Sequence, residues 1–199
     1  MKTKITFTLA LLLTAGQITS CSVKKEDHHD HAATENIEAV SDSVSGPQFL
    51  VDINFQKQLA DVFASYVTLK DAFVSSDPVK VKSLAGNVAQ SLQKTDMKLL
   101  SGAAHNDWMN YQNTMQSSLQ EIQSGADLAA QRKSFSTLSD NLYKSIKAFG
   151  LGGTEAFYEF CPMAFNNEGA YWLSDQSQIR NPYFGDEMLT CGSVVENLK

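Results

Sequence analysis

The sequence predicts an all-α fold, with an up-down four-helix bundle in residues 49–153 and a small hairpin or turn segment in residues 154–199. Three observations support this prediction. Apolar residues recur at steps of three and four through four successive stretches, which is the spacing of a buried helical stripe. All four prolines lie outside these stretches. Short connections between the stretches favour antiparallel neighbours.

The first two helices are separated by a clear stop signal. Ser75-Ser76-Asp77-Pro78 ends the first helix, and we expect Asp77 to cap the second, with Pro78 at its first helical position. The first stripe consists of Phe55, Leu59, Val62, Tyr66, Leu69 and Phe73, and the second of Val81, Leu84, Val88 and Leu92.

A break or a short extra turn at residues 97–102 precedes the third helix. Asp127 is expected to cap the fourth helix, and Gly150-Leu151-Gly152-Gly153 ends it. The third stripe consists of His105, Trp108, Tyr111 or Gln112, Met115, Leu119 and Ile122. The fourth consists of Leu128, Phe135, Leu138, Leu142, Ile146 and Phe149.

The periodicity changes after Gly153. Residues 157–160 are aromatic and strand-prone, and residues 166–169 have the composition of a turn before a second apolar run at 170–173. This pattern predicts a small hairpin. Residues 181–185 form another predicted turn, after which Asp186 is expected to cap one helical turn that runs to Cys191.

The N-terminus has the pattern of an export signal. Lys2 and Lys4 precede an apolar stretch that is too short to span a bilayer. Residues 18–21 resemble a bacterial lipobox, so residues 1–20 are predicted to be a lipoprotein signal peptide and Cys21 the lipidated first residue. The alternative is an ordinary secretory signal with an incidental cysteine. Removing the two lysines changes the net charge from −6 to −8, and such an acidic body lacks the basic surface typical of nucleic-acid-binding proteins.

Residues 21–48 are predicted to be a lipidated, flexible tether, because charged and small residues predominate there. The mature protein is therefore expected to be anchored by lipid in the outer membrane of a Gram-negative envelope, facing the periplasm or the cell surface. His28, His29 and His31 form a small imidazole cluster in this tether. It is either a solvated polar tract or a weak site for metal capture.

The two cysteines of the folded part each lie close to a methionine. Cys161 is two residues from Met163, and Cys191 is three residues from Met188. Positions two apart share a face on an extended strand, and positions three apart share a face on a helical turn. Thiolate and thioether are soft ligands that select copper(I) over hard cations. The pattern therefore favours a soft-metal site, although a Cys161–Cys191 disulfide or a pair of buried free thiols also fits an exported protein.

His105 is a further candidate ligand. In an up-down bundle the third helix starts at the end where the fourth finishes, which is where the C-terminal segment emerges. His105 lies in the first turn of that third helix. It is either a ligand at the sulfur site or a hydrogen-bonded core histidine.

Several motifs recur in one known family. They are at residues 131–135, 138–139, 161–164, 172–174, 181–185 and 188–192. Through them the chain resembles, over roughly residues 55–196, an uncharacterised helical domain family of exported lipoproteins. In that family the same domain also occurs fused to adaptor proteins of heavy-metal efflux pumps. The resemblance implies a link to copper or related metals, an efflux adaptor or metal-donor protein as partner, and no enzyme activity.

The Cys161-Pro162-Met163 motif also resembles the short heavy-metal-binding module of copper and silver efflux adaptors. In that module the motif continues into histidine and proline, whereas Ala164-Phe165 follows here. The ligand set of the module therefore does not transfer whole.

Enzyme motifs are missing from the sequence. It has no Gly-rich phosphate loop, no Glu-x-x-His pair on any of the predicted helices, as a di-iron bundle needs, and no Cys-x-x-Cys-His haem site. We therefore expect a non-catalytic protein. We also expect it to be a monomer.

Overall fold

The structure of the protein, a computed structural model, describes residues 46–199. The predicted signal peptide, the predicted lipidation site Cys21, the histidines His28, His29 and His31 and most of the predicted tether lie outside the described residues.

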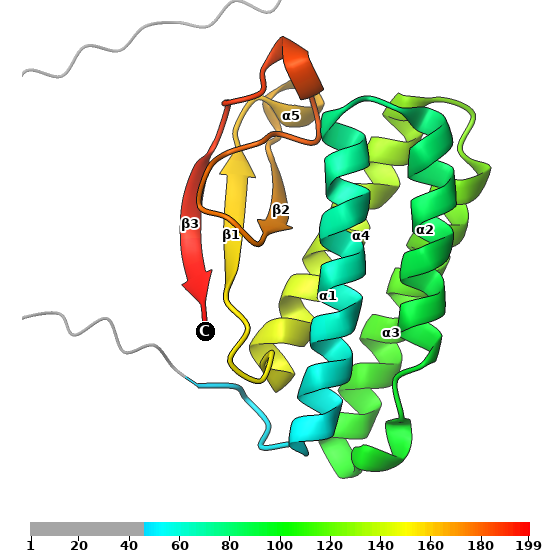
Figure 1. The fold of residues 1–199 in the computed structure, drawn as a ribbon, viewed down its shortest axis with the longest axis vertical. Helices are drawn as coiled ribbons and strands as arrows, with labels where there is room; N and C mark the ends of the chain where they lie inside the picture. The colour runs from blue at the N-terminus through cyan, green and yellow to red at the C-terminus, as the bar shows by residue number, and fades with distance from the viewer. Residues whose placement is uncertain (1–45) are drawn as a thin grey trace, which may run out of the picture. The chain divides into compact units, whose positions relative to one another are not determined.

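Four long helices lie side by side, and each runs antiparallel to the one before it (Figure 1). They are α1 (Ile53–Val74), α2 (Pro78–Gln93), α3 (Gly102–Ser124) and α4 (Leu128–Phe149), with a short 3-10 turn, η1 (Met97–Leu99), between α2 and α3. All four predicted helices are therefore present. None of the described helices combines the length and the apolarity needed to cross a membrane.

The predicted capping signals fix the helix boundaries. The Asp77 carboxylate accepts hydrogen bonds from the backbone N–H groups of Val79 and Lys80, at 3.1 and 3.0 Å, at the start of α2. Asp127 accepts from Ala130 at 2.8 Å at the start of α4. Such caps satisfy backbone donors that the first helical turn leaves unpaired.

The helix stripes meet in an aromatic core. Phe149 packs edge-on against Phe55 and Trp108, with ring centroids 5.3 and 5.9 Å apart. Towards the other end of α1, Tyr66 stacks on Phe135 at 5.2 Å, and its hydroxyl lies 2.6 Å from the Ser139 hydroxyl. Pairing the hydroxyl group makes its burial tolerable.

The C-terminal segment forms a three-stranded antiparallel sheet in the order β2-β1-β3. The strands are β1 (Ala156–Cys161), β2 (Ala170–Ser174) and β3 (Ser193–Leu198). The predicted hairpin corresponds to β1 and β2, whereas β3 was not predicted. The all-α class is therefore incomplete: the fold is mostly helical but carries a small sheet, which lies beside α1 and α4 (Figure 1).

Two short elements connect the strands. The turn α5 (Ala164–Asn167) joins β1 to β2, and Phe165, Asn166 and Asn167 adopt left-handed backbone conformations there. The 3-10 turn η2 (Gly185–Glu187) precedes β3 and is shorter than the helical turn predicted to run to Cys191.

Candidate functional site

The two cysteines of the folded part come together. Their Sγ atoms are 2.7 Å apart, although the residues are 30 positions apart in the sequence. Cys161 is the last residue of β1 and is fully buried, whereas Cys191 lies just before β3 and is partly exposed. The pair is therefore reached from solvent on the Cys191 side.

Cys161 is buried on the face of β1 that also carries Glu159. Glu159 and Cys161 are two residues apart and so point to the same face of the sheet. Their partners across the strand pair, Trp172 and Ala170, are buried as well. This face carries the Glu159 carboxylate, the Cys161 sulfur and the buried Ser174 hydroxyl among apolar side chains.

Cys191 is brought to Cys161 by the loop between β2 and β3. Arg132 of α4 donates from Nε to the Pro182 carbonyl at 2.9 Å and from Nη2 to the Ser76 hydroxyl at 3.0 Å. These bonds fix the loop to the end of the bundle where α1 finishes. Arg132 thus has a structural role, as its place beside the core stripe of α4 indicates.

Gly192 allows the close approach of the loop to the sheet. Its φ is +139°, and a Cβ atom added there lies 2.8 Å from both the Phe160 carbonyl oxygen and the Trp172 ring. A side chain at this position therefore pushes Cys191 away from Cys161.

We expect the Gly192→Ala variant to be less stable than the parent by about 1–3 kcal/mol, because the added methyl group overpacks a buried contact. Gly86→Ala is the matched control: it lies inside α2 with nothing within 4 Å of an added Cβ, and should stabilise by about 0.5–1 kcal/mol. Urea denaturation measures both changes. Equal effects in the two variants would contradict the close approach at Gly192.

The two methionines lie in the turns next to the two cysteines, and both side chains are exposed to solvent. Met163 is 44% exposed and Met188 is 37% exposed. Because β1 ends at Cys161, Met163 lies in the following turn, so the prediction that Cys161 and Met163 share a strand face is wrong. Cys191 and Met188 belong to one tight turn, in which the Cys191 N–H donates to the Met188 carbonyl at 3.0 Å.

The structure does not bring His105 to the sulfur pair. His105 lies in the first turn of α3, beside the start of α1, whereas the loop that carries Cys191 contacts the end of α1 near Val74. The 22 residues of α1 separate the two places by about 33 Å. The chain does emerge near the His105 end, as expected, but β1 then carries it back along the bundle (Figure 1).

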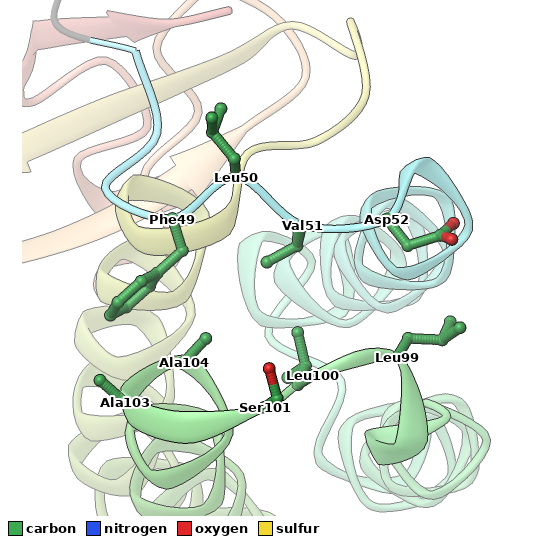
Figure 2. Close-up of a pocket in the computed structure, with 9 residues that line it drawn as sticks. All are labelled: Phe49, Leu50, Val51, Asp52, Leu99, Leu100, Ser101, Ala103 and Ala104. Carbon is green, nitrogen blue, oxygen red and sulfur yellow. The ribbon is translucent and has the colours of Figure 1, made fainter.

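A pocket of about 290 Å³ opens at this opposite end (Figure 2). Leu50 points away from it, and the start of α3 forms one wall. Its lining contains neither a cysteine nor a methionine, so it has no part in sulfur chemistry. The lining residues are Phe49, Leu50, Val51, Asp52, Leu99, Leu100, Ser101, Ala103 and Ala104.

Burial and the hydrogen bond with Cys161 raise the pKa of the Cys191 thiol, while a hydrogen bond from the Met163 backbone lowers it. The net shift is upward, so the thiol is protonated at neutral pH. This behaviour differs from that of a catalytic cysteine, whose pKa is lowered.

Glu159 is a feature of the site that sequence reasoning missed. Its side chain is fully buried, and neither carboxylate oxygen has a hydrogen-bond partner of good geometry. Burial raises the pKa of Glu159 to about 7, although Lys70 acts to lower it. The indole N–H of Trp172, the cross-strand partner of Glu159, also acts to lower the pKa of the carboxyl group. The available signal was a single charged residue inside the aromatic run of residues 157–160.

No group of three or more histidine, cysteine, aspartate or glutamate side chains placed to hold a metal ion occurs within residues 46–199. Any metal at the sulfur pair is therefore limited to two thiolates plus thioether, backbone or external ligands.

Residues 62–154 match the model of a family described as a protein of unknown function, DUF3347. This match confirms the predicted resemblance to a domain family of unknown function over most of the helical part. It ends before β1, so it does not include the two cysteines. The searches of curated proteins and of solved structures gave no match.

Proposed function

We propose that this protein is an envelope lipoprotein that binds copper(I) or silver(I) through Cys161 and Cys191, in order to store, sequester or hand over the ion. The observation that supports this proposal best is the convergence of the two sulfur atoms at 2.7 Å. A shared soft-ligand site requires this convergence, and it brings together two cysteines from distant parts of the chain.

The donor set favours a soft monovalent ion. Thiolate and thioether ligands select copper(I), and two thiolates suffice for an ion of low coordination number. Zinc usually takes four nitrogen, sulfur or oxygen ligands. The described residues offer no third histidine, cysteine or carboxylate at the pair, so zinc is expected to bind less tightly.

Metal loading requires the sulfur atoms to separate. With metal–sulfur bonds of about 2.3 Å, two thiolates on one ion lie up to about 4.6 Å apart. The observed 2.7 Å separation is shorter. Rotation of the partly exposed Cys191 side chain provides this movement without disturbing β1.

The exposure of the two methionines predicts a modest effect on copper(I) affinity when either is replaced. We expect Met163→Leu and Met188→Leu to weaken copper(I) binding only partly, because both methionine side chains are exposed to solvent. Leucine preserves the volume, so the cost to stability should stay below about 1.5 kcal/mol. Competition with a copper(I) chelator measures the affinity, and urea denaturation measures the stability. An affinity unchanged in the double variant would remove both methionines from the ligand set.

The test of the proposed function is a titration under anaerobic conditions. The Cys21→Ser chain is titrated with copper(I) in the presence of a competing chelator, and in parallel with zinc. We expect close to one copper(I) per chain and much weaker zinc binding. A failure to compete with the chelator would reject the proposal.

The same geometry favours a second candidate function. A disulfide bond is about 2.05 Å long, so the sulfur atoms are also close to bonding distance. In that case the bridge would fasten β1 to the loop before β3, and the domain would be a non-catalytic interaction module that docks on an envelope partner. Thiols that stay unreactive in anaerobically isolated protein until a reductant is added would favour this alternative.

The localisation is part of the proposal. It rests on the lipobox-like residues 18–21, which lie outside the described residues, and on the resemblance to exported lipoproteins. An efflux adaptor or a metal-donor protein is the partner that we propose to receive or supply the ion, and the histidines His28, His29 and His31 are candidates for weak capture near the membrane.

We expect metabolic labelling with a fatty acid to mark the protein and Cys21→Ser to abolish the label, because the cysteine sulfur is the attachment point in bacterial lipoproteins. Fractionation should recover the parent in the outer membrane. Recovery of the parent in the soluble periplasmic fraction without an acyl mass would contradict the anchor.

A further inference from the structure

Asn181 has all of its polar groups paired inside the loop that carries Cys191. Its side chain is fully buried. The side-chain Nδ2 donates to the Cys191 carbonyl at 2.8 Å, and Oδ1 accepts from the Tyr183 N–H at 2.8 Å. The backbone N–H of Asn181 donates to Leu189 at 2.8 Å, and its carbonyl accepts from Gly185 at 3.1 Å. Four hydrogen bonds therefore close the loop around this one residue.

The loop is in turn attached to the helices. Arg132 binds the Pro182 carbonyl, which directly follows Asn181 in the chain. Gly185 lies so close to the end of α1 that an added Cβ would be 2.8 Å from the Val74 carbonyl. Asn181 thus connects the helix bundle to Cys191: Arg132 binds the neighbouring Pro182, and the Asn181 side chain binds the Cys191 carbonyl.

Both the backbone N–H and the backbone carbonyl of Cys191 are hydrogen-bonded. Its N–H donates to Met188, and its carbonyl accepts from the Asn181 side chain. With the backbone fixed in this way, the only remaining freedom that moves the sulfur is rotation of the Cys191 side chain. A fixed backbone is what holds two thiols at a high effective concentration.

We propose that Asn181 is a positioning residue that holds Cys191 against Cys161. The inference deepens the proposed function, because it names the group that places one of the two thiolate ligands. Its consequence is measurable without any metal, since the same placement governs how readily the two thiols form a disulfide.

The test is the thiol–disulfide equilibrium with glutathione, measured on the full chain carrying Cys21→Ser. In this reaction a bond forms between the sulfurs of Cys161 and Cys191, and the bond of glutathione disulfide breaks. Two electrons and two protons pass from the protein dithiol to yield two glutathione thiols. The equilibrium constant gives the effective concentration of one cysteine at the other.

We expect Asn181→Ala to lower this effective concentration by about tenfold to a hundredfold, because small misplacements of reacting groups have effects of that size. Asn181→Asp is measured beside it. It keeps the acceptor for the Tyr183 N–H but replaces the donor to Cys191 by a carboxylate oxygen, so it removes that hydrogen bond and adds a buried charge. Gln131→Ala is the matched control: this buried amide also donates to a backbone carbonyl, that of Ile122 at 3.2 Å, but at the α3–α4 connection. It should change the effective concentration by less than about twofold.

Effective concentrations within twofold of the parent in both folded Asn181 variants would overturn the inference. So would loss of folding in both, because Asn181 would then be a general determinant of the fold. The proposed function is judged separately. If the parent binds no copper(I) but the Asn181 variants show the loss, the positioning role stands and the metal proposal fails.

Discussion

Cys161→Ser and Cys191→Ser are each expected to reduce copper(I) binding below the level that competes with a chelator. Each variant removes one of two thiolates, and the described residues contain no third histidine, cysteine or carboxylate positioned to replace it. A serine hydroxyl is a hard, neutral donor that copper(I) does not favour. Measurement is by competition titration with the Cys21→Ser chain as the parent.

His105→Ala is the control for this pair of variants. It removes the one imidazole within residues 46–199, which lies near the opposite end of α1 from the sulfur pair. It should leave copper(I) affinity unchanged. If His105→Ala weakened binding as much as a cysteine variant, the placement of the metal at the sulfur pair would be wrong.

Glu159 is expected to make the fold less stable as the pH rises. Burial raises its folded-state pKa to about 7, from an ordinary value of 4.5; Lys70 acts to lower the pKa and Asp175 to raise it. The folded protein therefore retains a proton that the unfolded chain loses between these two values. Stability falls with increasing pH in this interval and levels off above pH 7. The total loss is about 3–4 kcal/mol, because the pKa difference of about 2.5 corresponds to about 1.4 kcal/mol for each unit.

The Glu159→Gln variant tests this expectation. Urea denaturation between pH 5 and pH 8 should show a much flatter dependence of stability on pH than in the parent. The exposed Glu168 provides the control, since Glu168→Gln should keep the slope of the parent. A slope that persists in Glu159→Gln would assign the pH dependence to other groups.

The helices were predictable because local signals determine them. The stripes give the buried faces, and the Asp77-Pro78 pair and Asp127 mark helix starts through contacts within one turn. The third strand was not predictable in this way. β3 is a short segment whose Val194 and Val195 are exposed, and it is defined by its pairing with β1, whose residues lie 33–42 positions earlier in the chain.

The candidate site was likewise predictable only in part. The chemistry of Cys161 and Cys191 can be read from the sequence, but their distance depends on the loop held by Arg132 and Asn181. The error about His105 has a related cause. The position where the chain leaves α4 was inferred correctly, but the direction of β1 after that point was not. Cys161 is the last residue of β1, so that direction places it at the other end of the bundle (Figure 1).

The most direct test of the central claim is a count of free thiols in the Cys21→Ser chain, isolated without oxygen, before and after addition of one equivalent of copper(I). A shared metal site predicts two reactive thiols per unfolded chain before addition. In the folded chain, where Cys161 is fully buried, the informative thiol is Cys191. It should react before copper is added, be protected in the copper-loaded protein, and react again when a chelator removes the copper. Thiols that remain equally reactive with and without copper, or that are already joined before copper is added, would contradict the claim.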